Sequence, residues 1–112
     1  MGLSSRSFTY KRRIKVSPND LRLAKAGKKT CTIRLGSNKV DGNSIDLSDG
    51  RESLHVRIIS VETHLFGDLN EEHAKAEGFE TLEELRRDLG SYYGKIHETQ
   101  PVTVISFSRL LE

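Results

Sequence analysis

The stretch that decides the fold is GKKTCTIR, residues 27–34. A short helical pattern precedes it, and a glycine such as Gly27 commonly ends a helix. From Thr30 onward, β-branched residues alternate with others, which predicts a strand over residues 30–35. Because side chains alternate along a strand, one face is apolar and can be buried, with Cys31, Ile33 and Leu35. The other face is polar and carries Thr30, Thr32 and Arg34.

The polar face stands beside a Gly-Lys-Lys turn and could form the floor of a site for a polar or anionic ligand. The structural alternative is that Lys28 and Lys29 only offset the negative end of the preceding helix dipole. Charge is unevenly distributed along the chain. Residues 1–34 carry ten basic and one acidic side chain, whereas residues 35–112 carry eight basic and fifteen acidic ones. This pattern predicts a basic face that can meet phosphate, unless the two halves pair with each other in the fold.

The length of 112 residues predicts one domain. We expect residues 1–10 to form a flexible arm and residues 11–112 to form the domain. The single cysteine, Cys31, cannot form an internal disulfide, which fits a reducing, cytoplasmic setting. No apolar run approaches the roughly 18 residues that span a membrane, so we expect no membrane partner.

The predicted order of elements is β, α, β, β, β, α, α, β. Ser17 and Pro18 are placed to open the first helix, which runs to Gly27. Thr81 and Glu84 have capping-box spacing and open the last helix, which we expect to end at Gly90. The other expected segments are strands over 14–16, 44–47, 53–63 and 102–107, a loop or wide hairpin over 36–44, and a helix over 69–77. This order favours an α+β fold, a small and mostly antiparallel barrel or sheet flanked by helices.

Few residues outside the strand point to chemistry. The four histidines are scattered, so metal binding, for instance by His73 and Glu77 four residues apart, is the weaker interpretation, and we expect no cofactor. Tyr92 and Tyr93 could stack on a base, although packing of such a pair on the sheet is commoner. Glu77 is unusual because it ends its helix, where the dipole disfavours a carboxylate.

The pattern Gly27-x-Lys29-Thr30-x-Thr32-x-Arg34 resembles the signature of the ASCH domains, a branch of the PUA-like superfamily. The resemblance continues in order and spacing from about residue 14 to the C-terminus. Its later motifs are Glu72-His73-Ala74, Glu77-Gly78-Phe79, Leu82-x-x-Leu85, Tyr92-Tyr93, and the closing Val104, Ile105 and Phe107. It implies a small PUA-like β-barrel flanked by helices, with a cleft lined by the signature turn and strand.

By length and layout, the chain looks most similar to the compact bacterial N4-acetylcytidine amidohydrolases within this family. In that group a lysine and a threonine of the signature act with a glutamate from the later helix. The resemblance carries these catalytic roles onto Lys29, Thr32 and Glu77. It also implies Lys28, Thr30 and Arg34 as ligand contacts, and a modified nucleoside or RNA as partner. The longer basic arm and the loop over residues 36–50 depart from the pattern.

The implied reaction is hydrolysis of an amide at an acylated exocyclic nitrogen. Thr32 is the nucleophile and needs an adjacent base. Lys29 can act as that base if burial or nearby cations favour its neutral form, and Glu77 then passes a proton to the leaving nitrogen. Ideal alternation places Lys29 on the Cys31 side, away from Thr32, so the turn must rotate it inward. One alternative is a non-catalytic RNA- or nucleotide-binding module, since ASCH domains are proposed RNA-binding modules. The other is a ribonuclease, as some members are reported to be.

Overall fold

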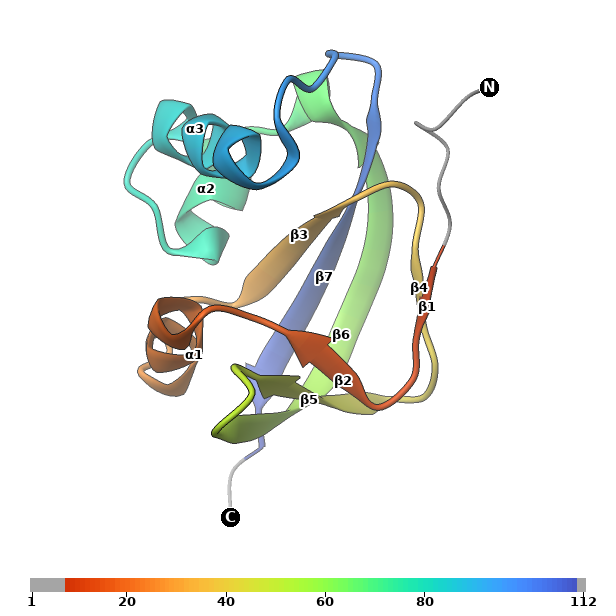
Figure 1. Ribbon diagram of the computed structural model, residues 1–112, viewed down its shortest axis with the longest axis vertical. Helices are drawn as coiled ribbons and strands as arrows, with labels where there is room; N and C mark the ends of the chain where they lie inside the picture. The colour runs from red at the N-terminus through yellow and green to blue at the C-terminus, as the bar shows by residue number, and fades with distance from the viewer. Residues whose placement is uncertain (1–7, 111–112) are drawn as a thin grey trace.

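The computed structural model describes residues 8–110 as a curled sheet with three α-helices beside it (Figure 1). In chain order its elements are β1 (Thr9–Tyr10), β2 (Arg13–Lys15), α1 (Pro18–Lys25), β3 (Cys31–Leu35), β4 (Lys39–Val40), β5 (Ser44–Ser48), β6 (Ser53–Leu65), the 3₁₀ turn η2 (Phe66–Asp68), α2 (Glu71–Glu77), α3 (Leu82–Tyr93) and β7 (Pro101–Arg109). The predicted α+β class is confirmed.

Five strands form one sheet in the order β2-β5-β6-β7-β3. The pairings of β5 with β6, β6 with β7 and β7 with β3 are antiparallel, whereas β2 and β5 are parallel. Strands β1 and β4 form a separate parallel pair. The sheet is therefore mixed and curls into a half-barrel, rather than the mostly antiparallel barrel we expected. The edge strands β2 and β3 face each other across the open side of the half-barrel.

The helices begin where the sequence provides caps. Ser17 Oγ accepts a hydrogen bond from the Asp20 backbone N–H at 3.0 Å, and Thr81 Oγ1 accepts one from Glu84 at 3.2 Å. These two predicted caps are confirmed. Helix α3 runs past the expected end at Gly90 to Tyr93, because Gly90 lies within the helix and Gly94, with a φ of 78°, ends it.

Two short strands were not expected. Thr9–Tyr10 falls in the predicted arm, and Lys39–Val40 falls in the predicted loop. They pair with each other, with Thr9 opposite Lys39, so this stretch differs from the expected arm. Two-residue strands leave no periodicity in a sequence. Residues 1–7 of that arm lie outside the described residues.

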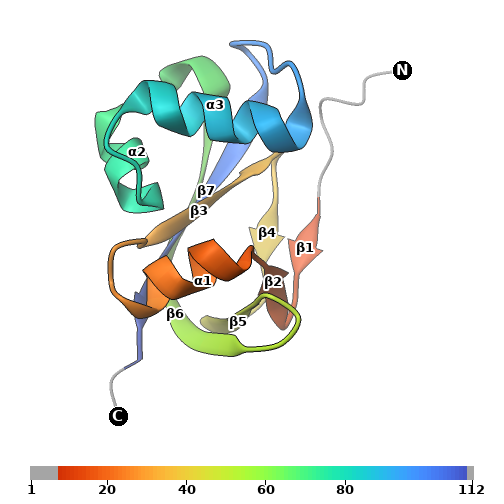
Figure 2. The ribbon, with the colours of Figure 1, turned by 60° about the vertical axis from the view of Figure 1, so that its left-hand side comes forward.

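Two hydrophobic cores cover the two faces of the sheet. The first core packs α1 against the sheet, with Ile14, Val16, Leu21, Ala24, Ile45, Leu47, Val56, Ile105 and Phe107. The second core packs α2 and α3 against it, with Cys31, Ile33, Phe66, Leu69, Ala74, Leu85, Leu89, Val102 and Val104. Strand β3 runs between α1 and the α2–α3 pair (Figure 2). The two helix layers therefore approach each other at β3.

Cys31 is 1% exposed, and burial raises the pKa of its thiol to about 12. A thiol with such a pKa stays protonated, so Cys31 acts as a small buried hydrophobe on the apolar face predicted for its strand. Within residues 8–110, no helix is long and apolar enough to cross a membrane.

Substitution of two glycines tests the backbone conformation at the end of α2 and within α3. Gly78 has a φ of 99°, and a Cβ there would lie 3.2 Å from Leu23 Cδ1. We expect Gly78→Ala to destabilise the protein by about 1–2 kcal/mol, since the left-handed conformation disfavours L-residues. Gly90 is helical with open space around it, so Gly90→Ala is expected to stabilise by up to about 1 kcal/mol. Urea unfolding of both variants measures the contrast, and equal effects would contradict this description of the C-terminus of α2.

Candidate active site

Strand β3 sends its two polar side chains toward one cavity. Thr32 and Arg34 pair with Ile105 and Thr103 of β7, and their side chains point to the concave side of the sheet. Thr32 is 3% exposed, yet it lines the cavity. Its Oγ1 accepts a hydrogen bond from Arg34 Nε at 3.2 Å. The alternation of polar and apolar faces predicted from the sequence therefore describes β3 correctly.

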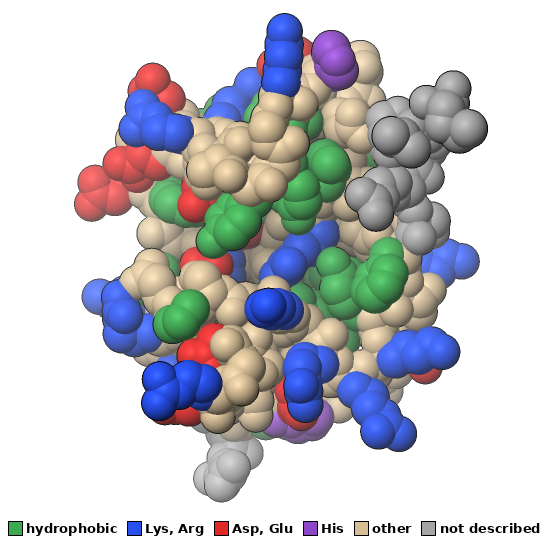
Figure 3. Space-filling view, in the orientation of Figure 1, with side chains coloured by type: hydrophobic (Ala, Val, Ile, Leu, Met, Phe, Trp, Pro, Cys, Tyr) green, Lys and Arg blue, Asp and Glu red, His purple; other side chains and the backbone are tan. Residues whose placement is uncertain are grey.

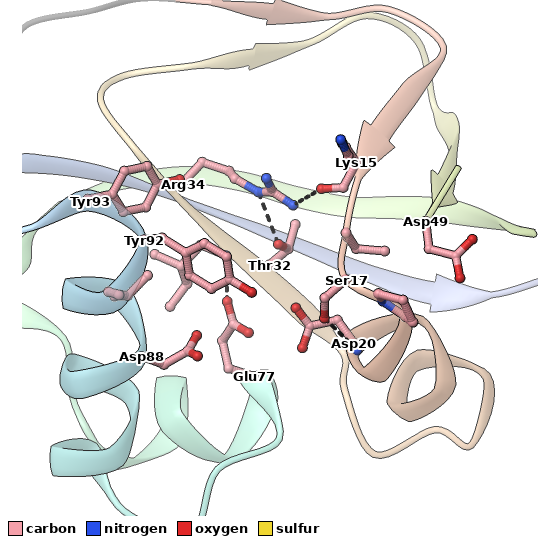
Figure 4. Close-up of a pocket in the computed structure, with 14 residues that line it drawn as sticks. Lys15, Ser17, Asp20, Thr32, Arg34, Asp49, Glu77, Asp88, Tyr92 and Tyr93 are labelled. Carbon is pink, nitrogen blue, oxygen red and sulfur yellow. Dashed lines mark hydrogen bonds between the residues drawn. The ribbon is translucent and has the colours of Figure 1, made fainter. Parts of the chain in front are cut away.

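Arg34 also bridges the open edge of the half-barrel. Its Nη2 donates to the Lys15 carbonyl of β2 at 2.6 Å. Because β2 and β3 are the two edges of the sheet, the Arg34 side chain joins strands that backbone pairing leaves apart. The guanidinium thereby donates one hydrogen bond to Thr32 on its own strand and one to the Lys15 carbonyl on β2 (Figure 4).

Lys29 lies in the turn before β3. The backbone N–H groups of Lys28 and Lys29 donate to the Leu23 carbonyl at 2.9 and 3.2 Å, which closes the end of α1. The Lys29 side chain is 1% exposed and forms an ion pair with Glu77 Oε1. Since β3 begins at Cys31, strand alternation does not govern Lys29. The turn directs its ammonium group to Glu77 and not to the floor of the cavity.

Glu77 is the last residue of α2 and is 6% exposed. Its second carboxylate oxygen, Oε2, accepts the Ile33 backbone N–H at 2.7 Å. That N–H belongs to the free edge of β3, so the carboxylate satisfies a donor which the sheet leaves unpaired. Burial raises the pKa of Glu77, and the charge and hydrogen bond of Lys29 oppose that rise. The unusual position of this acid in its helix is thus explained by two buried partners.

The cavity between α1, β3 and α3 has a volume of about 340 Å³. Fourteen residues line it (Figure 4), and the polar ones are Lys15, Ser17, Asp20, Thr32, Arg34, Asp49, Glu77, Asp88, Tyr92 and Tyr93. Lys29 stands behind Glu77, outside this lining. Lys28 and Thr30, which we expected to contact a ligand, are exposed and lie outside it as well. The structure therefore brings Thr32, Arg34 and Glu77 to one cavity and leaves Lys28 and Thr30 away from it.

The sequence analysis did not identify Asp20 or Asp88 as lining residues, and it gave a ligand contact by Tyr92 only as the less common of two interpretations. Asp20 and Asp88 come from α1 and α3 and reach the same cavity. Burial raises the pKa of Asp88, and the neighbouring Asp20 charge adds to that rise. Tyr92 is 63% exposed and lines the cavity, so it does not pack on the sheet as the commoner interpretation had it.

His73 and Glu77, the pair considered as metal ligands, contact different partners. His73 Nδ1 accepts the Asn70 backbone N–H at 3.0 Å and completes the N-terminal cap of α2, while Glu77 binds Lys29. Both side chains are thus engaged separately. Across residues 8–110, no group of three or more His, Cys, Asp or Glu side chains could hold a metal ion.

This arrangement has defined chemical capabilities. A nearly buried hydroxyl lies under a fixed guanidinium, and a carboxyl group that shares a buried ion pair lies on the same cavity wall. Such a carboxyl can exchange protons with a ligand, and the guanidinium can stabilise negative charge beside the hydroxyl. The hydroxyl, the carboxyl and the guanidinium are therefore of the chemical types that can serve as nucleophile, proton carrier and anion stabiliser.

Comparison with known proteins identifies the family of the chain. No established family model matches the chain. Two Vibrio vulnificus proteins named N(4)-acetylcytidine amidohydrolase, from strains CMCP6 and YJ016, are 38% and 37% identical to it over 90 residues. In each case the match covers 76% of this chain and 83% of the relative.

Solved structures share the fold. The ASCH domain from Lactobacillus crispatus JV V101 has a TM-score of 0.67 at 14% identity, covering 94% of this chain and 80% of that one. A protein from Enterococcus faecalis V583 has a TM-score of 0.60 at 18% identity, covering 94% of this chain and 76% of that one. This chain belongs to the ASCH-domain family, in the group of the N(4)-acetylcytidine amidohydrolases.

The buried ion pair can be tested by its effect on stability. Lys29→Met leaves the Glu77 carboxylate buried without its cation, and we expect a loss of about 3–5 kcal/mol. Adding Glu77→Gln removes the stranded charge, so the double variant is expected to be more stable than Lys29→Met alone. Urea unfolding of the two single variants and the double variant at pH 7 measures this, and strictly additive losses would contradict direct coupling.

The same variants give a pH signature. Without Lys29, the opposing charge is gone and burial raises the Glu77 pKa further. A carboxyl whose pKa is raised in the folded state stabilises that state at low pH, and the stability is lost as pH rises through the folded-state pKa. Lys29→Met is therefore expected to recover stability, relative to the wild type, on acidification from pH 7. The double variant serves as control and is expected to lack this recovery.

Proposed function

We propose that this protein is an amidohydrolase that removes the acyl group from the exocyclic nitrogen of a pyrimidine nucleoside such as N4-acetylcytidine. The observation that carries the proposal is the buried Lys29–Glu77 pair, whose carboxyl forms part of the wall of the cavity that Thr32 lines. The names of the Vibrio relatives support the reaction and the substrate class. A volume of about 340 Å³ lies near the lower end of small-ligand pockets, roughly 300–1,000 Å³, and suits a nucleoside.

In the proposed reaction, Thr32 Oγ attacks the acyl carbonyl carbon. Its proton passes to the Lys29–Glu77 pair, and the Arg34 guanidinium stabilises the negative charge that develops on the carbonyl oxygen. The bond from carbon to the exocyclic nitrogen then breaks as that nitrogen takes a proton from Glu77. Cytidine leaves, and the acyl group remains as an ester on Thr32.

Water completes the cycle. It attacks the ester carbon and gives a proton to the Lys29–Glu77 pair, and the carboxylic acid leaves as Thr32 Oγ regains a proton. Glu77 is the member of the pair that faces the cavity, with Lys29 behind it. We therefore propose that Glu77 handles the proton in both steps and that Lys29 sets its charge state, with Lys29 acting on Thr32 through Glu77.

A second candidate function is binding of a nucleotide or RNA without hydrolysis. The observation that favours it is the position of Thr32 Oγ1, which is bonded to Arg34 and not to a carboxylate. A donor to this oxygen lowers its nucleophilicity in the resting site, and a ligand contact requires no activation. Binding of cytidine derivatives without release of acid would support this alternative.

The test of catalysis is turnover of N4-acetylcytidine, followed by chromatography of cytidine. We expect Glu77→Gln and Thr32→Ala each to lower kcat by at least about 100-fold, the usual range for a lost proton carrier or nucleophile. Thr32→Ser keeps the hydroxyl and is expected to retain measurable turnover. Thr63→Ala, an exposed threonine of β6 away from the cavity, is the matched control. Wild-type rates in Thr32→Ala and Glu77→Gln would exclude the proposed roles.

A further inference from the structure

A second groove adjoins the cavity. Its volume is about 410 Å³, and it shares Lys15, Arg34 and Tyr93 with the first. Its remaining lining comes from Phe8, Tyr10, Leu35 and Asn38. Arg34 lines both spaces, and its guanidinium donates a hydrogen bond to the hydroxyl of Thr32. The established family and the proposed reaction assign no role to this second space.

The outer wall of the groove is aromatic. Phe8 precedes β1 and is 56% exposed, and its ring lies 4.6 Å from that of Tyr10 in an edge-on arrangement. Tyr10 packs partly against the first core, which fixes this wall on the domain. A large exposed aromatic ring held in one place offers a face for stacking a planar ligand group.

The junction between the two spaces is basic. Lys15 and Arg34 line both of them. Arg34 has five N–H donors, more than its bonds to Thr32 and Lys15 use. Figure 3 shows Lys and Arg side chains within the hollow on this face of the molecule and hydrophobic side chains on both sides of it. The carboxylates of Asp20 and Asp88 line only the first cavity, so positive charge is concentrated where the two spaces meet.

We propose that the second groove binds the nucleotide attached to the acylated nucleoside, so that the preferred substrate is a short single strand rather than a free nucleoside. The inference rests on the proposed function and adds a subsite to it. The acylated nucleoside occupies the first cavity, the phosphodiester crosses Lys15 and Arg34, and the neighbouring base stacks on Phe8. Cations at a junction followed by an aromatic face match a phosphate followed by a base. A larger acyl group would gain nothing from those cations.

The experiment compares two substrates: N4-acetylcytidine and a trinucleotide with N4-acetylcytidine between two uridines. We expect the trinucleotide to have the higher kcat/KM at low salt. Phe8→Ala is expected to lower the ratio of the two kcat/KM values about tenfold, the effect of removing one stacking ring. Lys15→Gln is expected to lower the dependence of the trinucleotide reaction on log salt concentration by about one charge. Ile59→Ala removes an apolar side chain, 59% exposed on β6, and serves as the matched control.

Three results would overturn the subsite. The first is equal kcat/KM values for the two substrates, and the second is an unchanged ratio of these values in Phe8→Ala. The third uses N4-benzoylcytidine as an additional substrate: a Phe8→Ala defect confined to it would assign the groove to the acyl group. A separate binding arm uses a fluorescent trinucleotide with an unmodified central cytidine. If the protein hydrolyses neither substrate but Phe8→Ala weakens this binding about tenfold, the amidohydrolase proposal fails and the subsite stands. If Phe8→Ala leaves that binding unchanged, the subsite fails whatever the catalytic result.

Discussion

The site depends on the two interactions that the buried carboxylate of Glu77 makes. One oxygen binds the Lys29 ammonium group and the other accepts the Ile33 N–H of β3. Through these two bonds, a single side chain ties α2 to the turn after α1 and to the edge of the sheet. Burying an ion pair costs desolvation that the attraction between the charges often only balances, and apolar residues of the same volume would commonly be as stable. The catalytic role that we propose for the carboxyl at the cavity wall therefore explains the pair better than stability does.

The open sheet creates the space for that cavity. A closed barrel would join its edge strands by backbone hydrogen bonds, and its interior would be filled with side chains. Here the edges β2 and β3 are instead linked through the Arg34 side chain. Glu77 covers the free N–H of Ile33 on β3, and just before the strand the Thr30 N–H donates to the Ala76 carbonyl at 2.7 Å. The groups that protect the edge from pairing with another chain are thus the same groups that line or support the site.

The features that could be predicted from the sequence are those that depend only on residues close together in the chain. The alternation along β3, the Ser17 and Thr81 caps and the unusual position of Glu77 are all carried by neighbouring residues. The parallel pairing of β2 with β5 and of β1 with β4 joins segments about 30 residues apart, and no pattern within either partner encodes it. The same reason explains why Phe8 and Asp88 escaped notice as lining residues. Each reaches a cavity only because a distant element brings it there.

The position of Lys29 depends both on neighbouring residues and on a distant helix. Period-two alternation placed it away from Thr32, and it does lie outside the cavity lining, but for a different reason. The strand starts two residues later, and the end of α1 holds the Lys29 backbone to Leu23. The basic N-terminal half and the acidic C-terminal half meet through Lys29–Glu77 and through Lys25–Glu52, at 2.6 Å. Lys15 and Arg34 nevertheless stay in the lining of the cavity. Pairing between the two halves therefore accounts for part of the uneven charge. Contact of the remaining basic side chains with phosphate stays a prediction.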